Sequence, residues 1–184
     1  MDQLVCQRRL GWLEGTFHVL FPSSNGDPVK RPELASATVA ALKTAGVRAQ
    51  LHYMRGVSNA EVPLWMNASH ALLLTSAHEG SPTVVKEALA CGLPVVSVDV
   101  GDVAERIEGV VGCHLALAKP EDLAANLRVV QQTGCRVVAR EKIQTLSLRN
   151  VALKLEHFYR DTLARWNQTV EFEDPHPDQR IMVS

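Results

Sequence analysis

The sequence has few of the features that mark disulfide-rich, metal-binding, membrane-spanning or nucleic-acid-binding proteins. Its four cysteines, Cys6, Cys91, Cys113 and Cys135, are far apart and form no CxxC pair, which argues against a disulfide framework or a zinc site. No H-x-x-x-H pair occurs among the seven histidines, so no metal site is predicted. The longest apolar stretch, residues 71–75, is far too short to span a membrane. A net charge of -1 argues against a nucleic-acid partner or an anionic membrane surface.

The first residues also lack a secretory signal, because MDQLVCQRRLGW is polar and basic. Together with cysteines that read as reduced, this predicts a cytoplasmic protein. The chain opens on a short helix-like piece that ends at Leu10-Gly11, where an α/β enzyme usually opens on a strand. We therefore expect the chain to be one domain of a longer protein.

The composition is that of a soluble globular domain, with 46% hydrophobic and 21% charged residues. A length of 184 residues suits one domain better than two. We place a single domain at residues 1–168 and a polar, proline-containing tail, expected to be disordered, at residues 169–184.

Apolar stretches alternate with amphipathic ones along the domain. This alternation predicts a Rossmann-like α/β fold, a doubly wound parallel sheet with helices on both faces. Ligands of such sheets bind beyond the carboxyl ends of the strands, so the loops after Phe21, Tyr53, Thr75 and Val98 are the candidate site. Strands are predicted at 17–21, 47–53, 71–75, 95–98 and 111–116, and helices at 33–45, 59–67, 83–91 and 120–133, with one or two more over 136–166.

The loop after the third predicted strand leads directly into a helix. Pro82 lies near the helix start, where the amides of residues 83–85 are expected to be free, and such a start binds phosphate well. Gly80 lets a ligand approach the backbone closely, and Glu79 would stand at the mouth of the crevice. Glu87, one turn into the helix, could accept hydrogen bonds from a ribose diol. From spacing alone, helix capping by Glu79 and a solvated Glu87 fit equally well.

The run from Glu79 to Val96, EGSPTVVKEALACGLPVV, follows the pattern E-G-x-x-x-x-x-x-E-A-x-A-x-G-x-P-V-V. This pattern resembles the signature of retaining GT-B glycosyltransferases, the group that includes glycogen synthase-like and mannosyltransferase enzymes. Residues 56–71 and 100–105 are similar to two further runs of that family, and the likeness covers about residues 5–165. It implies the C-terminal, donor-binding half of a GT-B fold.

The resemblance implies a role for each matching residue. Lys30 would neutralise the diphosphate leaving group without a metal or other cofactor, because a cation there stabilises the charge that grows in the transition state. Glu79 would hydrogen-bond hydroxyls of the donor sugar, and Glu87 those of the ribose. The residues implied in binding a UDP- or GDP-sugar, from the base to the sugar, are Gly56, Val57, Gly80, Ser81, Thr83, Val84 and Glu87.

Two departures from the family pattern concern the first and third loops. The family has Gly-Arg shortly after the first strand, whereas no arginine precedes Lys30 here, and whether Arg31 replaces it stays open. Ser81 stands where the family often has Phe-Gly, which implies a differently shaped sugar pocket.

The implied function is hexosyl transfer from a nucleotide-diphosphate sugar to an unknown acceptor, with retention. Half of a nucleotide-sugar epimerase and a non-catalytic scaffold of the same fold are the alternatives. The family's N-terminal domain, which supplies the acceptor site, has no room in this chain, so we expect the chain alone to bind nucleotide weakly and to transfer nothing. Peripheral membrane contact stays compatible with the full protein.

Overall fold

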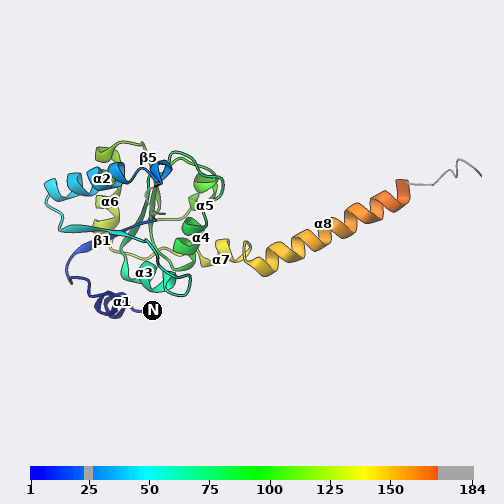
Figure 1. Ribbon diagram of the computed structural model, residues 1–184, viewed down its shortest axis with the longest axis horizontal. Helices are drawn as coiled ribbons and strands as arrows, with labels where there is room; N and C mark the ends of the chain where they lie inside the picture. The colour runs from blue at the N-terminus through cyan, green and yellow to red at the C-terminus, as the bar shows by residue number, and fades with distance from the viewer. Residues whose placement is uncertain (23–26, 170–184) are drawn as a thin grey trace, which may run out of the picture. The chain divides into compact units, whose positions relative to one another are not determined.

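The computed structural model describes residues 1–22 and 27–169 (Figure 1). The predicted tail, apart from its first residue, lies outside the described residues. The chain divides into two compact units, Met1–Ile143 and Gln144–Ser184. The first unit contains the sheet and is described first.

The first unit is built on a five-stranded parallel sheet with the strand order β2-β1-β3-β4-β5. This arrangement confirms the predicted doubly wound, Rossmann-like α/β fold. The direction of winding reverses between β1 and β3, which lie side by side at the centre. The strands are β1 (Phe17–Phe21), β2 (Ala49–Tyr53), β3 (Ala71–Leu74), β4 (Val95–Val98) and β5 (His114–Ala116).

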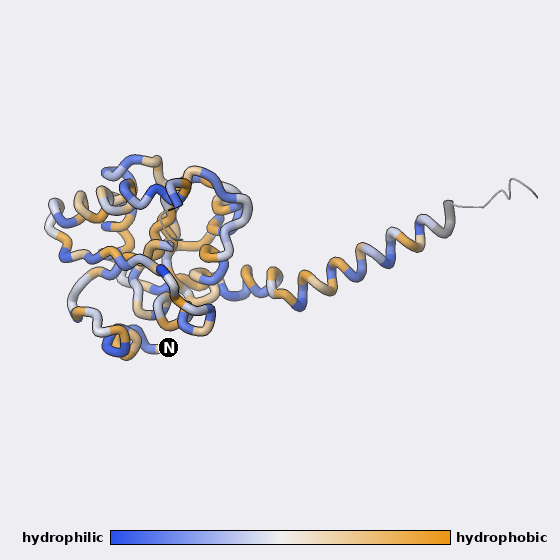
Figure 2. Tube along the Cα trace, viewed as in Figure 1, coloured by the Kyte–Doolittle hydropathy of each residue, from blue (hydrophilic) through white to orange (hydrophobic). Residues whose placement is uncertain are grey.

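Burial follows the position of each strand in the sheet. Every residue of β1, β3 and β4 is buried, because helices cover both faces of a central parallel strand. The edge strands β2 and β5 are only partly buried. The orange centre of Figure 2 is this apolar sheet.

Helices cover both faces of the sheet. On one face, α2 packs against α6, and on the other lie α3, α4 and α5 (Figure 1). The helices of the first unit and its boundary are α1 (Gln3–Arg9), the 3-10 helix η1 (Pro28–Lys30), α2 (Pro32–Thr44), α3 (Val62–Ala68), α4 (Thr83–Ala90), α5 (Val103–Ile107), α6 (Pro120–Thr133) and α7 (Arg140–Gln144).

Several predicted bounds shift by a few residues, and three helices differ for reasons that the structure shows. α3 begins at Val62, later than the predicted start at residue 59. The Ser58 hydroxyl instead donates to the Glu61 carboxylate, 2.7 Å away, and Pro63 lies in the first turn, where its missing N–H costs nothing. η1 and α5 were not predicted, because helices of three and five residues are too short to leave a periodic pattern.

Two segments far apart in sequence cap the carboxyl end of α3. The side-chain amides of Gln3 and Gln7, both in α1, donate to the carbonyls of Ser69 and Ala68 at 2.7 and 2.9 Å. The guanidinium of Arg136 donates to two carbonyls in the last turn of α3. A helix leaves its last carbonyls without internal partners, so these three side chains satisfy groups that would otherwise be orphaned.

Three histidines lie together beneath Trp12, on the side of the sheet near α3. Nδ1 of His18 lies 2.8 Å from Nε2 of His52, and Trp12 stacks on the His52 ring at 3.6 Å between centroids. Nδ1 of His70 accepts a hydrogen bond from the backbone N–H of His18. Burial lowers the pKa of His52 and of His70 to about 4, and it also lowers the pKa of His18. The cluster is therefore neutral at ordinary pH.

The second unit contains α8 (Leu148–Thr169), a helix of 22 residues. Figure 2 shows orange and blue alternating along it, the pattern of an amphipathic helix. Its apolar side chains, among them Leu155, Phe158 and Trp166, are exposed. Within the described residues, no helix is both long and apolar enough to cross a membrane.

Candidate functional site

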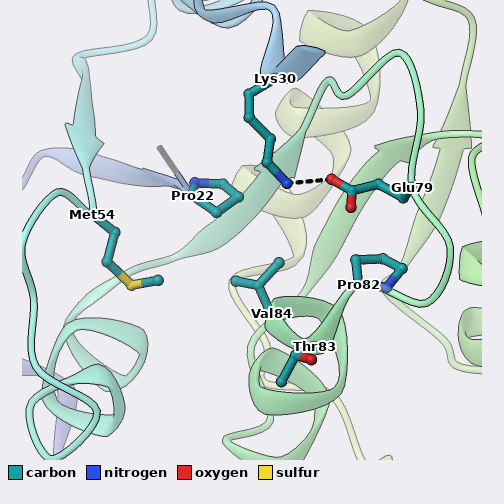
Figure 3. Close-up of a pocket in the computed structure, with 7 residues that line it drawn as sticks. All are labelled: Pro22, Lys30, Met54, Glu79, Pro82, Thr83 and Val84. Atoms are coloured by element: carbon teal, nitrogen blue, oxygen red, sulfur yellow. Dashed lines mark hydrogen bonds and ion pairs between the residues drawn. The ribbon is translucent and has the colours of Figure 1, made fainter. Parts of the chain in front are cut away.

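A cavity of about 250 Å³ opens at the carboxyl ends of the central strands. Of the four loops predicted to form the site, those after β1, β2 and β3 contribute to it, and no described residue of the loop after Val98 lines it. It lies at the point where the winding of the sheet reverses, the usual ligand site of such folds. Figure 3 shows the lining residues, Pro22, Lys30, Met54, Glu79, Pro82, Thr83 and Val84.

Lys30 and Glu79 face each other inside this cavity (Figure 3). Nζ of Lys30 donates to Oε1 of Glu79 over 2.5 Å. The two side chains are only 21% and 14% exposed, so solvent screens the ion pair little. The two residues to which the sequence assigned catalytic roles are thus brought together from loops 49 residues apart.

The described part of the loop that carries Lys30, from Asp27 onward, is held by hydrogen bonds. The Asp27 carboxylate accepts from the Val29 backbone N–H at 2.9 Å and starts η1. The Val29 carbonyl in turn accepts from the Ala77 N–H at 2.7 Å, which joins this loop to the one after β3. Lys30 therefore projects from backbone that is fixed on two sides.

The start of α4 forms one wall of the cavity. The helix starts at Thr83, as predicted, and Pro82 is the residue directly before it. The amides of Thr83 and Val84 have no acceptor among the described residues, whereas the Val85 N–H donates to the Pro82 carbonyl at 3.2 Å. Two amides are therefore open to a ligand, not the predicted three, and they add to the positive end of the helix dipole.

The turn after β4 supports the Gly80–Ser81 backbone from behind. The Ser81 hydroxyl donates to Oδ2 of Asp102 at 2.5 Å, and the Asp102 N–H donates to the Gly80 carbonyl at 3.1 Å. A Cβ added at Gly101, whose φ is +58°, would lie 2.4 Å from that same carbonyl oxygen. Only glycine fits there without a shift of backbone.

Asp102 is itself fixed by a cation. Arg106, one turn later in α5, donates to Oδ2 of Asp102 at 2.8 Å. Burial alone would raise the pKa of Asp102, but hydrogen bonds from Ser81 and Arg106 outweigh it and hold that pKa below its usual value. The carboxylate stays ionised and keeps accepting from Ser81.

Glu87 lies in α4, outside the set of residues that line the cavity. Its side chain is partly buried, and burial raises the pKa of its carboxyl group. Among the described residues, no hydrogen-bond or ion-pair partner of this carboxylate is found. Glu87 is thus not the fully solvated surface group of the alternative interpretation, and Glu79, which that interpretation made a helix cap, pairs with Lys30 instead.

The remaining predicted residues do not line the cavity. Gly56 and Val57 follow β2 but do not line it; Met54, two residues earlier, does. Gly80 and Ser81 are next to the lining residue Glu79 and turn toward Asp102. Sequence reasoning missed the contributions of Pro22, Met54 and Asp102. Pro22 and Met54 directly follow predicted strands, and Asp102 lies in the loop after one; only these positions could have signalled them.

No group of three or more histidine, cysteine, aspartate or glutamate side chains is arranged to hold a metal ion in the part of the chain that the structure describes. The charges that the cavity offers are those of Lys30 and Glu79, with the dipole of α4. Such a site suits a ligand that combines an anionic group with hydroxyls.

Solved structures with the same fold are glycosyltransferases or related proteins. Sucrose-phosphate synthase of Thermosynechococcus elongatus is 18% identical and aligns with a TM-score of 0.69 over 89% of this chain and 50% of its own. The HepE protein of Anabaena, solved with UDP and glucose, is 19% identical, with a TM-score of 0.64 over 86% of this chain and 51% of its own. WaaG, a glycosyltransferase of lipopolysaccharide biosynthesis, is 18% identical, with a TM-score of 0.60 over 78% of this chain and 46% of its own.

These likenesses establish the fold, half of a GT-B architecture, and the chain spans about half the length of the structures it matches. A comparison with curated protein sequences gave no match. Residues 25–132, more than half of the chain, match the family described as Glycosyl transferases group 1. They include both Lys30 and the whole run from Glu79 to Val96. The chain therefore belongs to the group 1 glycosyltransferases.

Proposed function

We propose that this domain binds the diphosphate and sugar of a nucleotide-sugar donor in the cavity between η1 and α4, for transfer with retention by a longer protein. The observation that carries the proposal is the Lys30–Glu79 pair facing the open amino end of α4. A cation, two free amides and a carboxylate meet there within one cavity.

The positive groups suit a diphosphate. Lys30 offers a nearby ammonium, and the Thr83 and Val84 amides offer hydrogen-bond donors that need no reorganisation. In the free domain Glu79 already partners Lys30, so an incoming diphosphate exchanges with a carboxylate rather than meeting a bare cation. Glu79 is then released to accept hydrogen bonds from sugar hydroxyls.

The acidic groups suit the two diol-bearing parts of such a donor. Glu87 is a partly buried carboxylate without a partner in the described chain, and two hydroxyl donors would satisfy it. Its place in α4, after the free amides of the helix start, agrees with a ribose linked to the diphosphate. Ribose binding by Glu87 and sugar binding by Glu79 are both part of the proposal.

Calorimetric titration of the 184-residue chain with UDP, GDP and uridine tests this assignment. We expect a diphosphate to bind more tightly than uridine, and Lys30→Ala to weaken diphosphate binding about tenfold while leaving uridine unchanged. Glu33→Gln, in the first turn of α2, is the matched surface control. If neither diphosphate binds, the domain is a scaffold that has kept the fold.

The chain alone should bind the donor without transferring sugar, since its relatives of known structure are about twice as long. Incubation with UDP-glucose and GDP-mannose, followed by chromatography of the nucleotides, checks this. Release of UDP or GDP by the 184-residue chain would contradict it, and a changed sugar still attached to nucleotide would favour an epimerase.

A further inference from the structure

Arg31 follows the cavity lysine and has a strained backbone. Its φ of +49° makes it the one non-glycine residue with a positive φ among the described residues. A side chain in this left-handed region costs roughly 1 kcal/mol, and such strain persists only where surrounding contacts hold it. Arg31 connects two helices, because it is the last flanking residue of η1 and the residue directly before α2.

The guanidinium of Arg31 points to backbone rather than to the cavity. Its Nε donates to the Thr75 carbonyl at 2.5 Å, and one terminal nitrogen donates to the Ser76 carbonyl at 3.0 Å. Arg31 is not among the residues that line the cavity beside Lys30. A rigid fork of donors can bridge two successive carbonyls in this way, and an ammonium cannot.

Thr75 completes a reciprocal link. Its hydroxyl is fully buried and lies 2.7 Å from the Lys30 carbonyl, to which it donates. The Ala77 N–H donates to the Val29 carbonyl at 2.7 Å. The loop before α2 and the loop after β3 are thus joined on both sides of Lys30 by hydrogen bonds in both directions. These are the same two loops that carry Lys30 and Glu79.

We propose that Arg31 is a positioning residue: it locks the Lys30 loop onto the carboxyl end of β3, so that Lys30 is held against Glu79, and it does not itself contact the diphosphate. It therefore does not replace the arginine that the family carries earlier in this loop. The effect on ligand binding rests on the proposed function, whereas the lock itself exists in the free protein.

The free protein tests the lock first. Arg31→Gly removes the guanidinium but suits the positive φ, so relief of strain offsets part of the two lost hydrogen bonds, and the melting temperature should fall only modestly. Hydrogen exchange of the Ala77 amide, which crosses between the loops, should speed up about tenfold or more. The Leu72 amide, which donates to the Pro94 carbonyl, is the internal control. Unchanged exchange at Ala77 would overturn the proposal, whatever the domain binds.

Binding of UDP then tests the connection to Lys30 through a double-mutant cycle. Arg31→Gly should weaken UDP about tenfold when Lys30 is present and less than about twofold in Lys30→Ala, because a positioning residue has nothing left to position. Arg31→Lys should behave like Arg31→Gly, since it keeps the charge but loses the fork. Additive losses, or full UDP affinity in Arg31→Lys, would mean direct contact with the phosphates and would overturn the proposal. If UDP fails to bind and GDP binds, the cycle is run with GDP. If neither diphosphate binds the unaltered chain, the proposed function fails, and the exchange result alone decides whether the lock exists.

Discussion

The hydroxyl of Ser81 donates a 2.5 Å hydrogen bond to Oδ2 of Asp102, and this bond ties the glycine-containing loop of the cavity to the turn after β4. The Asp102 carboxylate also accepts a hydrogen bond from the Arg106 guanidinium, so a second partner fixes its orientation. The loop that contacts a donor sugar in our proposal is therefore shaped by residues that lie behind it.

Asp102→Ala should release Ser81 and weaken binding of a nucleotide-diphosphate sugar about three- to tenfold, a typical cost of losing one charge-assisted hydrogen bond and the order it gives a loop. Calorimetric titration with UDP-glucose measures the change. Glu105→Gln is the control, because Glu105 contacts Arg106 as well but is 68% exposed. Equal effects of the two substitutions would assign the loss to Arg106 instead of to the Ser81 loop.

Gly101→Ala should destabilise the domain more than an ordinary glycine substitution at positive φ. Its Cβ would meet the Gly80 oxygen at 2.4 Å, which adds overpacking of roughly 1–3 kcal/mol to the cost of the conformation. Gly109 is a matched control, since its φ is +69° and nothing lies within 4 Å of an added Cβ. Urea unfolding of both variants separates the two costs. A difference near zero would show that the Gly80 backbone yields freely.

Glu87→Gln should stabilise the free domain at pH 7 and weaken UDP binding. Burial raises the pKa of Glu87, so the folded state favours the protonated form and carries a cost once the carboxyl ionises. The gain in stability should therefore be present at pH 7 and shrink as the pH falls toward the ordinary glutamate value of about 4.3. Thermal unfolding across this range, with and without UDP, measures both effects. A variant that is less stable at pH 7 would contradict this reading of Glu87.

The histidine cluster should make the domain sensitive to acid. The pKa values of His52 and His70 are about 4 in the folded state, below the ordinary value near 6.5. Their neutral form is favoured by folding, so stability is complete well above pH 6.5 and is lost as the pH falls toward 4, on the order of 2 kcal/mol per histidine at pH 5.

Urea unfolding at pH 7.5 and pH 5 tests this sensitivity. His52→Gln should reduce the difference in unfolding free energy between the two conditions, because one buried group no longer takes up a proton. His157→Gln should leave it unchanged, since His157 lies in α8 and its side chain is 79% exposed. An equal pH dependence in His52→Gln and the unaltered chain would count against the cluster as its source.

Hydrophobic patterns within a single segment predicted the type of most strands and helices. The strand at 95–98 and the helix at 120–133 have the predicted bounds. The strand is a mostly apolar run, and the helix has an amphipathic period along its length, so each signal lies within one element. The fold class followed from the alternation of apolar and amphipathic stretches, and the family from the ordered run that begins at Glu79. The assigned roles of Lys30 and the other site residues stay predictions.

Contacts between distant segments were beyond the reach of such patterns. Nothing near Arg31 in sequence indicates that its guanidinium reaches residue 75, or that Ser81 would bond to a side chain 21 residues later. The free amides at α4 were overcounted because a tight turn at Pro82 uses one of them. The two side-chain contacts join loops that become neighbours only when the sheet forms, because the order of the strands sets which loops lie side by side.

The capping of α3 has a consequence for a chain that emerges from the ribosome one residue at a time. Arg136 donates to a carbonyl 70 residues earlier, so the end of α3 cannot be completed until the segment after α6 has been synthesised. Until then, of the two caps of α3, only the one formed by the side-chain amides of Gln3 and Gln7 is available to the nascent chain. The carboxyl end of α3 therefore receives its last cap only after residue 136 has been synthesised.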